Sequence, residues 1–397
     1  MKQVVSICCK AGPYENAKLA LESLDLSAIK GKSVLIKPNN GRAALPEQGI
    51  NTHPQAVEAV IHVLKKAGAL RIAVGESPIV GVDTMKAFER SGIVEIAERN
   101  QIELVDLNQG QPVKKNIPGF RILESTKICS AVMDFDIILS LPVAKTHMHT
   151  GVTLGIKNMK GCLYRHEKVR YHQLEYEKSR VFPEKTLDSA ISDLAEILMP
   201  DLTVVDGYIG MEGLGPSGGE AIKSDFAVAS WNPMGADIFA IKMMGLDHQK
   251  IPHLALIAQR QQIPFRFEDY DIVGPNAADY KLHITDYKEP PTSISMEYPN
   301  IMIYDCESCS ACQSTVMLFL KRYYEDMMSF LLDDGKFHLA IGKNVTDSIK
   351  KGTILVGNCT KKFADLGIFV PGCPPVSTRI YESVTGREPE ENEPECK

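Results

Sequence analysis

The sequence predicts an α/β protein, in which a body with a largely parallel sheet precedes a second, smaller α/β domain. Three observations favour this class. Short β-branched runs alternate with amphipathic stretches through the first half of the chain, which is typical of βαβ units. Polar segments with several glycines follow some of these apolar runs. Five of the ten cysteines lie within residues 306–373, beyond the alternating region.

Length and charge set the domain count and exclude some partners. A chain of 397 residues exceeds what one hydrophobic core usually serves, so we expect a body over residues 1–298 and a cysteine-rich domain over 299–387. The acidic tail, 388–397, is expected to be disordered. The net charge of −6 gives no general attraction to nucleic acid. No apolar run reaches the ~18 residues that a membrane span needs.

The N-terminus, Met1–Lys10, has the pattern of a short strand rather than that of a signal peptide. We therefore expect a cytoplasmic protein. In a reducing cytoplasm, clustered cysteines are metal ligands or catalytic groups more often than disulfides.

The first βα unit of the body has the most complete local signals. Val34–Lys37 has the pattern of a buried strand. A helix is expected to follow, with Thr52 as its N-cap, Pro54 in its first turn and Gln55 at the capping-box position. Apolar residues then recur at helical spacing until Gly68 ends the helix.

The remaining elements of the body follow in chain order. Strands are expected at 71–74, 102–106, 137–142, 202–205 and 226–230. Helices are expected near 85–100, 187–198, 235–244 and 254–261. Residues 107–127 have the composition of a polar, irregular connection, and 206–219 that of a glycine-rich turn.

The cysteine-rich domain has its own series of elements. Strands are expected at 301–304, 337–341, 353–356 and 368–370, and a long helix at about 314–332. Cys306, Cys359 and Cys373 each come two or three residues after one of these strands. The carboxyl ends of parallel strands share one edge of a sheet, so these cysteines are expected to approach one another.

The spacing of the cysteines indicates an iron–sulfur cluster. Cys306, Cys309 and Cys312 form a C-x-x-C-x-x-C run, and short gaps of this kind let one turn present several soft thiolates to a cluster. The remaining ligand is then Cys359 or Cys373. A structural zinc site and reduced packing cysteines stay open as alternatives.

Three short motifs in this domain resemble the cluster signature of nickel–iron hydrogenase small subunits. They are Cys309–Met317, Val356–Cys359 and Pro371–Pro375. The resemblance implies a flavodoxin-like fold and a [4Fe–4S] cluster on Cys309, Cys312, Cys359 and Cys373. Cys306 departs from that pattern. It is the fifth candidate, either replacing Cys309 as a ligand or lying beside the cluster as a free thiol.

Segment 145–162 of the body is the densest in polar residues. Lys145, Lys157 and Lys160 supply positive charge, and its glycines let backbone N–H groups approach a ligand, which suits a carboxylate or phosphate. A surface loop with scattered lysines is the alternative. His147 is expected to orient a substrate, with a transition-metal site shared with His149 as the alternative.

The cysteines outside the C-terminal domain carry less information. Cys162 stays open as a packing residue, a nucleophile or a ligand. Cys8, Cys9 and Cys129 lie in apolar strand contexts and are expected in the core.

Polar residues are expected after three further strands. Asp206 and Glu212 begin and extend the glycine-rich segment, where they suit a base or ligands of a hard metal ion. The segment, which includes Gly213, fits neither a Walker loop nor a dinucleotide-binding fingerprint, and a flexible turn is the alternative. Two more clusters lie at strand ends. They are Lys37, Asn39, Thr52 and His53, and the segment Gly75–Pro78.

Taken together, these segments resemble the family called domain of unknown function 362, over about residues 30–260. The motifs are Lys37–Asn39, Thr52–Pro54, Gly75–Pro78, Leu141–His147, Lys157–Cys162 and Val205–Pro216. Leu214 departs from the family pattern, in which Asn is expected. The resemblance implies an association with iron–sulfur clusters and assigns no reaction.

The sequence therefore favours an iron–sulfur oxidoreductase that exchanges electrons with a small anionic substrate or a second cofactor. The expected catalytic residues are Lys145, His147, Asp206 and Glu212. The expected binding residues are Lys37, Asn39, Thr52, His53, Lys157, Asn158, Lys160 and Gly213. A non-redox iron–sulfur dehydratase or isomerase and a non-enzymatic electron carrier or cluster-delivery protein are the alternatives. No motif requires a flavin, and a redox partner protein and a homodimer both stay open.

Overall fold

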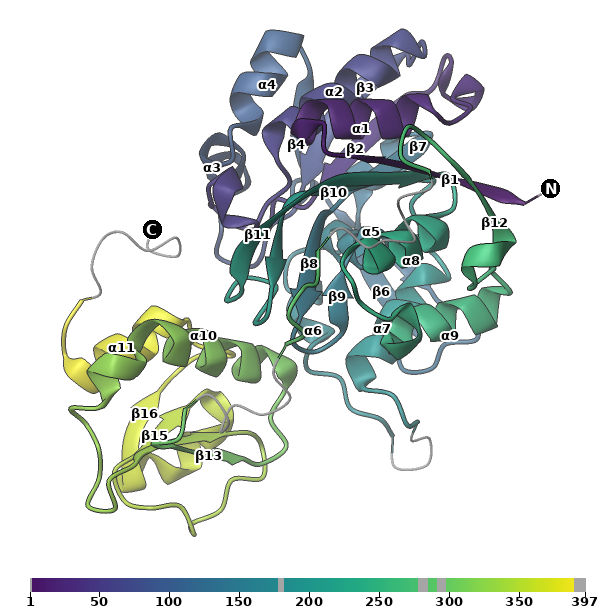
Figure 1. Cartoon of the computed structure of the whole chain (residues 1–397). Helices are drawn as coiled ribbons and strands as arrows, with labels where there is room; N and C mark the ends of the chain where they lie inside the picture. The colour runs from purple at the N-terminus through teal and green to yellow at the C-terminus, as the bar shows by residue number, and fades with distance from the viewer. Residues whose placement is uncertain (1, 178–181, 278–284, 291–297, 389–397) are drawn as a thin grey trace. The chain divides into compact units, whose positions relative to one another are not determined.

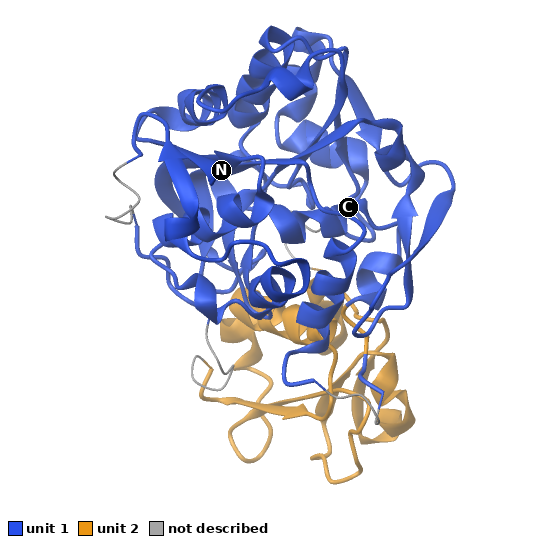
Figure 2. Cartoon of the chain, turned by 90° about the vertical axis from the view of Figure 1, so that its right-hand side faces the viewer, with its two compact units in different colours: residues 1–171, 175–290 blue, residues 172–174, 291–397 orange. Residues whose placement is uncertain are grey.

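A computed structural model of the chain describes residues 2–177, 182–277, 285–290 and 298–388. The chain forms two compact units (Figure 2). The first comprises residues 1–171 and 175–290, and the second comprises 172–174 and 291–397. The division thus falls within the Pro290-Pro291 pair, and one tripeptide from the body's range belongs to the second unit. Most of the expected acidic tail, from residue 389 on, lies outside the described residues.

The first unit is built on a ten-stranded, largely parallel sheet. Its strands are β1 (Gln3–Cys9), β2 (Ser33–Pro38), β3 (Arg71–Glu76), β4 (Glu103–Asp106), β7 (Ile137–Leu141), β8 (Val143–His147), β9 (Gly151–Thr153), β10 (Leu202–Glu212), β11 (Glu220–Ser230) and β12 (Tyr270–Val273). The main order is β12-β1-β11-β10-β7-β2-β3-β4. Neighbours from β10 to β4 are parallel, and β11 runs antiparallel to both β10 and β1.

Helices cover both faces of this sheet (Figure 1). They are α1 (Gly12–Glu22), α2 (Pro54–Lys66), α3 (Thr84–Arg90), α4 (Ile93–Asn100), α5 (Gly155–Asn158), α6 (Glu167–Arg170), α7 (Thr186–Ala195), α8 (Pro233–Met243) and α9 (Pro252–Gln261). Helices α1, α2 and α4 pack their apolar faces on one side, while α5 and α8 lie on the other, with α7 and α9 beside them. The α/β class and the parallel sheet predicted from the sequence are therefore confirmed.

Three local predictions in the first unit are wrong. The expected helix near 85–100 is two helices, α3 and α4, because Gly92 between them adopts a left-handed φ of 78°. The N-cap of α2 is His53 rather than Thr52. Residues 107–127 are not irregular throughout, since β5 (Pro112–Asn116) pairs with β6 (Ser125–Cys129) in a separate antiparallel ribbon.

The glycine-rich segment after residue 205 is mainly strand. Strand β10 continues through Asp206 to Glu212 because β11 pairs with it antiparallel along this stretch, with an irregularity between Gly207 and Ile209. The alternative of a long flexible turn from Asp206 to Gly219 is therefore wrong. Only residues 213–219 turn the chain, and Gly213 opens that turn with a φ of 69°.

The second unit has a four-stranded parallel sheet in the order β13-β14-β15-β16. Its elements are β13 (Ile301–Asp305), α10 (Ser310–Met327), β14 (Phe337–Ile341), β15 (Thr353–Val356), β16 (Gly367–Val370) and α11 (Ser377–Thr385). The parallel α/β character is as expected. The strands follow one another in sequence order, whereas flavodoxin has the order 2-1-3-4-5, so the likeness is in class and not in strand order.

Within the described residues, none of the helices combines the length and the hydropathy needed to cross a membrane.

Candidate functional site

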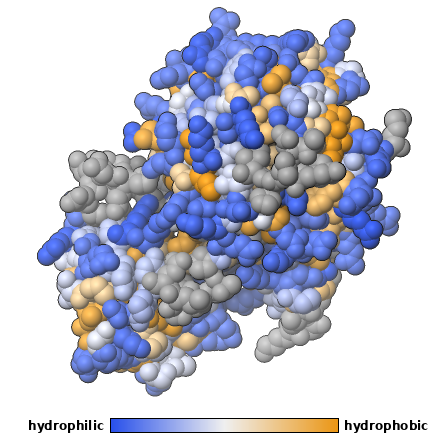
Figure 3. Space-filling model, viewed as in Figure 1, coloured by the Kyte–Doolittle hydropathy of each residue, from blue (hydrophilic) through white to orange (hydrophobic). Residues whose placement is uncertain are grey.

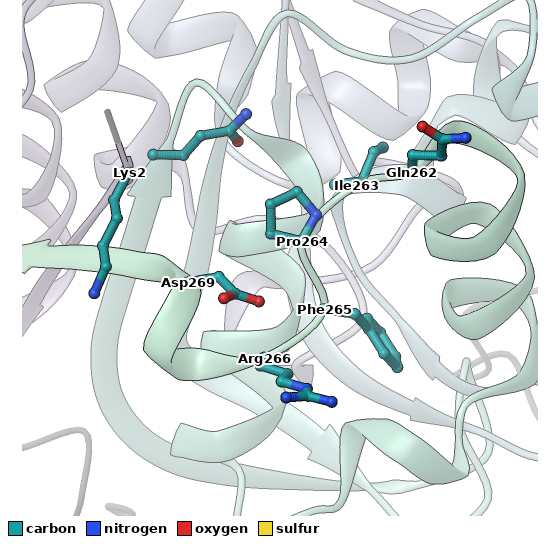
Figure 4. A pocket seen from close by; sticks show the side chains of 8 residues that line it. Lys2, Gln262, Ile263, Pro264, Phe265, Arg266 and Asp269 are labelled. Atoms are coloured by element: carbon teal, nitrogen blue, oxygen red, sulfur yellow. The ribbon is translucent and has the colours of Figure 1, made fainter.

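The surface offers little guide to the site. The face in Figure 3 is mostly hydrophilic, with apolar residues in small groups. A hollow of about 760 Å³ is lined by residues from the start of β1 and from the α9–β12 connection, among them Lys2, Pro264 and Arg266 (Figure 4). Because β1 runs in the same direction as β10, this hollow lies at the amino-terminal edge of the sheet. None of the predicted site residues lines it.

The predicted residues Lys37 and Asn158 belong to a buried network at the opposite, carboxyl edge. Lys37 Nζ donates to Glu76 Oε2 at 2.5 Å, to the carbonyl of Pro38 at 2.8 Å and to Asn158 Oδ1 at 3.3 Å. Asn158 in turn donates to the Lys37 carbonyl and to Ser140 Oγ. All three donors of the ammonium group are used, so Lys37 holds β2, β3 and α5 together.

Glycine at position 161 lets this network form. A Cβ there would lie 2.5 Å from Lys37 Nζ and 2.6 Å from Glu76 Oε1, which is closer than real Cβ contacts. The turn that contains Gly161 therefore packs directly on the Lys37–Glu76 pair.

Two of the three lysines of segment 145–162 are buried, and the third, Lys160, is half-buried. Lys145 and Lys157 are 3% and 8% exposed, and Lys160 lies with its Nζ 5.8 Å from the centre of the Tyr171 ring. Lys145 Nζ donates to the carbonyl of Ile50 at 2.8 Å. The alternative of a surface loop with scattered lysines is therefore wrong.

Burial and neighbouring positive groups lower the pKa of each of these lysines. Burial lowers the pKa of Lys145 to about 7, and Arg42 lowers it further. Burial also lowers the pKa of Lys160 to about 7, with Lys168 acting in the same direction. The pKa of Lys157 falls well below its usual value through burial and through Lys160 and Lys145. Buried ammonium groups of this kind are stabilised by a counter-anion.

Unpaired amide groups lie at the same edge, just after β2. Both side-chain polar atoms of Asn40 and Oδ1 of Asn39 are buried without a hydrogen-bond partner among the described residues. The backbone N–H of Asn40 donates to Glu76 Oε2 at 3.0 Å, which places Asn40 beside the Lys37 network. Buried amides normally have partners, so unpaired ones suggest a ligand or ordered water.

Thr52, Asn39, His53 and Asp206 join strand ends to α2. The Thr52 hydroxyl donates to the Leu141 carbonyl at 2.7 Å and accepts from the Asn39 N–H at 2.9 Å, which explains why it does not cap the helix. Asp206 accepts from the backbone N–H groups of His53 and Tyr208. Burial raises the pKa of Asp206 to about 6, although both hydrogen bonds oppose the rise.

Glu212, Gly213 and His147 make contacts of their own. Glu212 accepts from the backbone N–H of Lys288 at 2.9 Å, and the Gly213 carbonyl accepts from Thr146 Oγ1 at 2.9 Å. His147 Nδ1 accepts from the backbone N–H of His149 at 3.1 Å. The hydrogen bonds named above for the predicted binding and catalytic residues therefore do not form one continuous network.

The cysteines of the first unit are buried. Cys8, Cys9 and Cys129 lie in the core, as expected. Cys162 is fully buried, and burial raises the pKa of its thiol to about 12. A thiol this far from ionisation suits packing better than nucleophilic attack.

Four cysteines of the second unit lie around the carboxyl edge of its sheet. Cys309 precedes α10, Cys312 lies in its first turn, and Cys359 and Cys373 follow β15 and β16. The Cys312 thiol donates to the Cys309 sulfur, which lowers the pKa of Cys309. The same bond raises the pKa of Cys312, and the charges of Cys309, Cys373 and Cys359 raise it further. These four sulfurs therefore lie within electrostatic range of one another.

Cys306 lies apart from these four. The sheet of the second unit has a separate apolar cluster on each face. Cys309 and Cys312 pack in the cluster that includes Val316 and Val356. Cys306 packs in the other cluster, with Ala340 and Leu355. The chain turns between them at Glu307, whose φ is 55°.

The donor set suits an iron–sulfur cluster in type and placement. Four soft thiols come from three segments at one sheet edge, and the loops of Cys359 and Cys373 are joined by hydrogen bonds between Asn358 and Gly372. A Cβ at Gly357 would lie 3.4 Å from Cys312 Sγ, so glycine keeps the space beside that sulfur open. In the part of the chain that is described, no three Cys, His, Asp or Glu side chains are close enough together to hold a single metal ion.

Sequence reasoning missed several residues of these arrangements. Glu76, which pairs with Lys37, lies in the segment Gly75–Pro78 that was identified from the sequence. Its carboxylate at the end of a strand was the signal that could have indicated this role. Arg42, Asn40 and Lys168 gave no motif. His172 and Gln173 also contact the cysteine site. They lie far from the cysteines in the sequence, so no local pattern indicates these contacts.

Two known proteins resemble parts of the chain. One is a thylakoid-associated protein from Synechocystis sp., which is 28% identical over 268 residues, covering 68% of this chain and 79% of the relative. The other is the solved structure of the lactate racemase apoprotein from Thermoanaerobacterium thermosaccharolyticum, with 13% identity and a TM-score of 0.39. That match covers 62% of this chain and 57% of the racemase chain.

The family comparison agrees with the motifs at the sheet edge. The profile described as "Domain of unknown function (DUF362)" matches residues 34–242, which is more than half of the 397 residues. The matched range contains the Lys37–Glu76 pair, the buried lysines and Asp206. The chain belongs to the DUF362 family.

Proposed function

We propose that this protein is an iron–sulfur oxidoreductase. In this proposal the second unit holds a [4Fe–4S] cluster and the first unit binds a small anionic molecule among its buried lysines. The observation that carries the proposal is the grouping of four cysteine thiols at the carboxyl edge of the second unit's sheet, with Cys306 on the other face. A cluster bound there would supply one-electron transfer.

The surroundings of Cys309 support a thiolate ligand there. The hydrogen bond from Cys312 lowers the pKa of the Cys309 thiol most, and the backbone N–H groups of Ala311 and Cys312 and the charge of Lys343 lower it further. Thiolates are the form that binds iron. The hydrogenase-like motifs name the same four cysteines. The nine cysteines in the described residues are all free thiols, which accords with the reducing cytoplasm that we propose as the location.

The anion site of the first unit is proposed from charge and burial. Lys145 is buried within range of Arg42, and Lys157 is buried within range of Lys145 and Lys160, while Glu76 already neutralises Lys37. A carboxylate or phosphate would stabilise the charged form of these lysines. The unpaired amide of Asn40 offers further donors and an acceptor at the same sheet edge.

The proposal predicts that anions stabilise the first unit, and more strongly at low pH. Lysines with a folded pKa near 7, below the usual 10.5, release protons on folding, so their burial costs stability below pH 7 and little above pH 10.5. Phosphate or malonate should offset this cost and raise the melting temperature more at pH 6 than at pH 9. The fluorescence of Trp231, the sole tryptophan, reports the transition.

A pair of variants makes this test specific. In Lys157→Met the anion effect should shrink, whereas the exposed Lys66→Met should keep it, because Lys66 is 77% exposed. Sodium chloride at the same ionic strength controls for screening. An equal rise in melting temperature with anion in both variants would show that the anion does not bind at these lysines.

The redox part of the proposal is tested by anaerobic reconstitution with iron and sulfide. We expect iron and acid-labile sulfide in the ratio of one [4Fe–4S] cluster per chain, with visible absorption that bleaches when dithionite is added. Protein that binds no iron, or whose visible absorption does not change when dithionite is added, would refute the proposed function.

A further inference from the structure

One short segment contacts the cysteine site from far away in the sequence. His172–Leu174 belongs to the second unit, although the rest of that unit begins only at residue 291. His172 Nδ1 lies 2.7 Å from Oγ of Ser310, the residue after Cys309. Gln173 Nε2 donates to the sulfur of Cys373 at 3.1 Å. The tripeptide therefore touches two of the segments that carry the candidate ligands.

The Gln173 contact places an uncharged donor on the sulfur of a candidate cluster ligand. A side-chain amide is an uncharged donor at every pH, and here it points at a sulfur proposed as a cluster ligand. Cys373 is exposed and Gln173 is half-buried, so neither side chain belongs to the hydrophobic core. Its contribution is then electrostatic rather than one of packing.

A hydrogen bond to a ligand sulfur affects the two oxidation states of a cluster differently. Reduction adds one electron, and part of the added negative charge resides on the sulfurs. An N–H donor stabilises the more negative, reduced state more than the oxidised state, which raises the reduction potential. Lys343, whose charge acts on both Cys309 and Cys373, works in the same direction.

We propose that Gln173 is a positioning residue for the cluster, whose N–H donates to the Cys373 sulfur and raises the reduction potential. This inference rests on the proposed function, because it requires a cluster bound through Cys373. Gln173 would then help to set the reduction potential although it lies outside the cysteine motifs. It comes from a segment far ahead of the C-terminal residues that form the rest of this unit.

The test uses full-length protein reconstituted anaerobically, with the midpoint potential measured by an EPR-monitored redox titration. Gln173→Leu removes the donor at similar volume, and Gln173→Glu replaces it with a carboxylate. Both midpoints should be more negative than that of the wild type, and that of Gln173→Glu the more so. Asn300→Leu is the matched control, because Asn300 donates to a sulfur outside the site, that of Met328 at 3.7 Å. Its midpoint should not change.

The outcomes separate the inference from the function on which it rests. Wild-type protein that takes up no cluster would overturn both. A loaded Gln173→Leu variant with the wild-type midpoint would overturn the inference alone. If Gln173→Leu takes up no cluster, the midpoint potential of loaded Gln173→Glu is compared with that of the wild type instead, and an unchanged midpoint overturns the inference. Failure of both to load, beside a loaded wild type, would assign Gln173 a structural role and so overturn tuning of the potential.

Discussion

Replacing either Cys359 or Cys373 with serine is expected to abolish stable uptake of the cluster, while replacing Cys306 leaves it intact. Each of the first two thiols is the sole proposed ligand from its loop, after β15 and β16 respectively. A serine hydroxyl is a harder and more weakly acidic donor than a thiol, so it holds iron poorly. Cys306 packs on the opposite face of the sheet, away from the other four sulfurs.

Iron and sulfide content after identical anaerobic reconstitution measures this effect. We expect the Cys359→Ser and Cys373→Ser variants to lose most of their iron and the Cys306→Ser variant to retain the wild-type amount. Circular dichroism confirms that each variant is folded before loading. Loss of iron in Cys306→Ser, with retention in Cys359→Ser or Cys373→Ser, would reverse the ligand assignment.

Lys37→Met is expected to destabilise the first unit by about 3–5 kcal/mol, because it leaves the Glu76 carboxylate buried without its partner. Lys37 is fully buried and Glu76 is 2% exposed, with 2.5 Å between Nζ and Oε2. Removing both charges in Lys37→Met/Glu76→Leu should recover part of this loss. Recovery is incomplete, since the backbone N–H groups of Asn40 and Ser77 lose their acceptor.

Urea unfolding followed by Trp231 fluorescence measures the change within the first unit, because Trp231 packs against that unit's core. The exposed ion pair of Lys66 with Glu22 supplies the control, and Lys66→Met should cost no more than about 1 kcal/mol. A Lys37→Met variant as stable as Lys66→Met would show that the buried pair contributes nothing to the fold.

Much of the sheet could be predicted from the sequence because its strands are buried on both faces. Val34–Ile36 is a short apolar run, and Phe337–Ile341 is apolar except for His338. Both form strands over nearly those residues. Glycine-rich stretches were harder to interpret. The segment after Asp206 has turn composition, yet pairing with β11 keeps it extended up to Glu212. Tertiary hydrogen bonding overrides local propensity there.

The placement of the candidate residues was easier to predict than their pairing. Polar residues after strands were expected at the carboxyl edge of each sheet, because the carboxyl ends of parallel strands coincide, and the structure has them there. The sequence did not reveal that Lys37 is fully engaged by Glu76, since this depends on which strands are neighbours. Nor did it separate Cys306 from Cys309, because the turn at Glu307 decides which face each thiol meets. Gln173 lies 200 residues from Cys373, so no local sequence pattern indicates their contact.

Cysteine alkylation before and after cluster loading, read out by peptide mass spectrometry, tests the central claim most directly and needs no variant. Cys359 and Cys373 are exposed in the absence of a cluster and should react readily with iodoacetamide. Loading should protect both, together with Cys309 and Cys312, while the reactivity of Cys306 stays the same. Protection of Cys306, or full reactivity of Cys359 and Cys373 in iron-loaded protein, would contradict a cluster held by these four thiols.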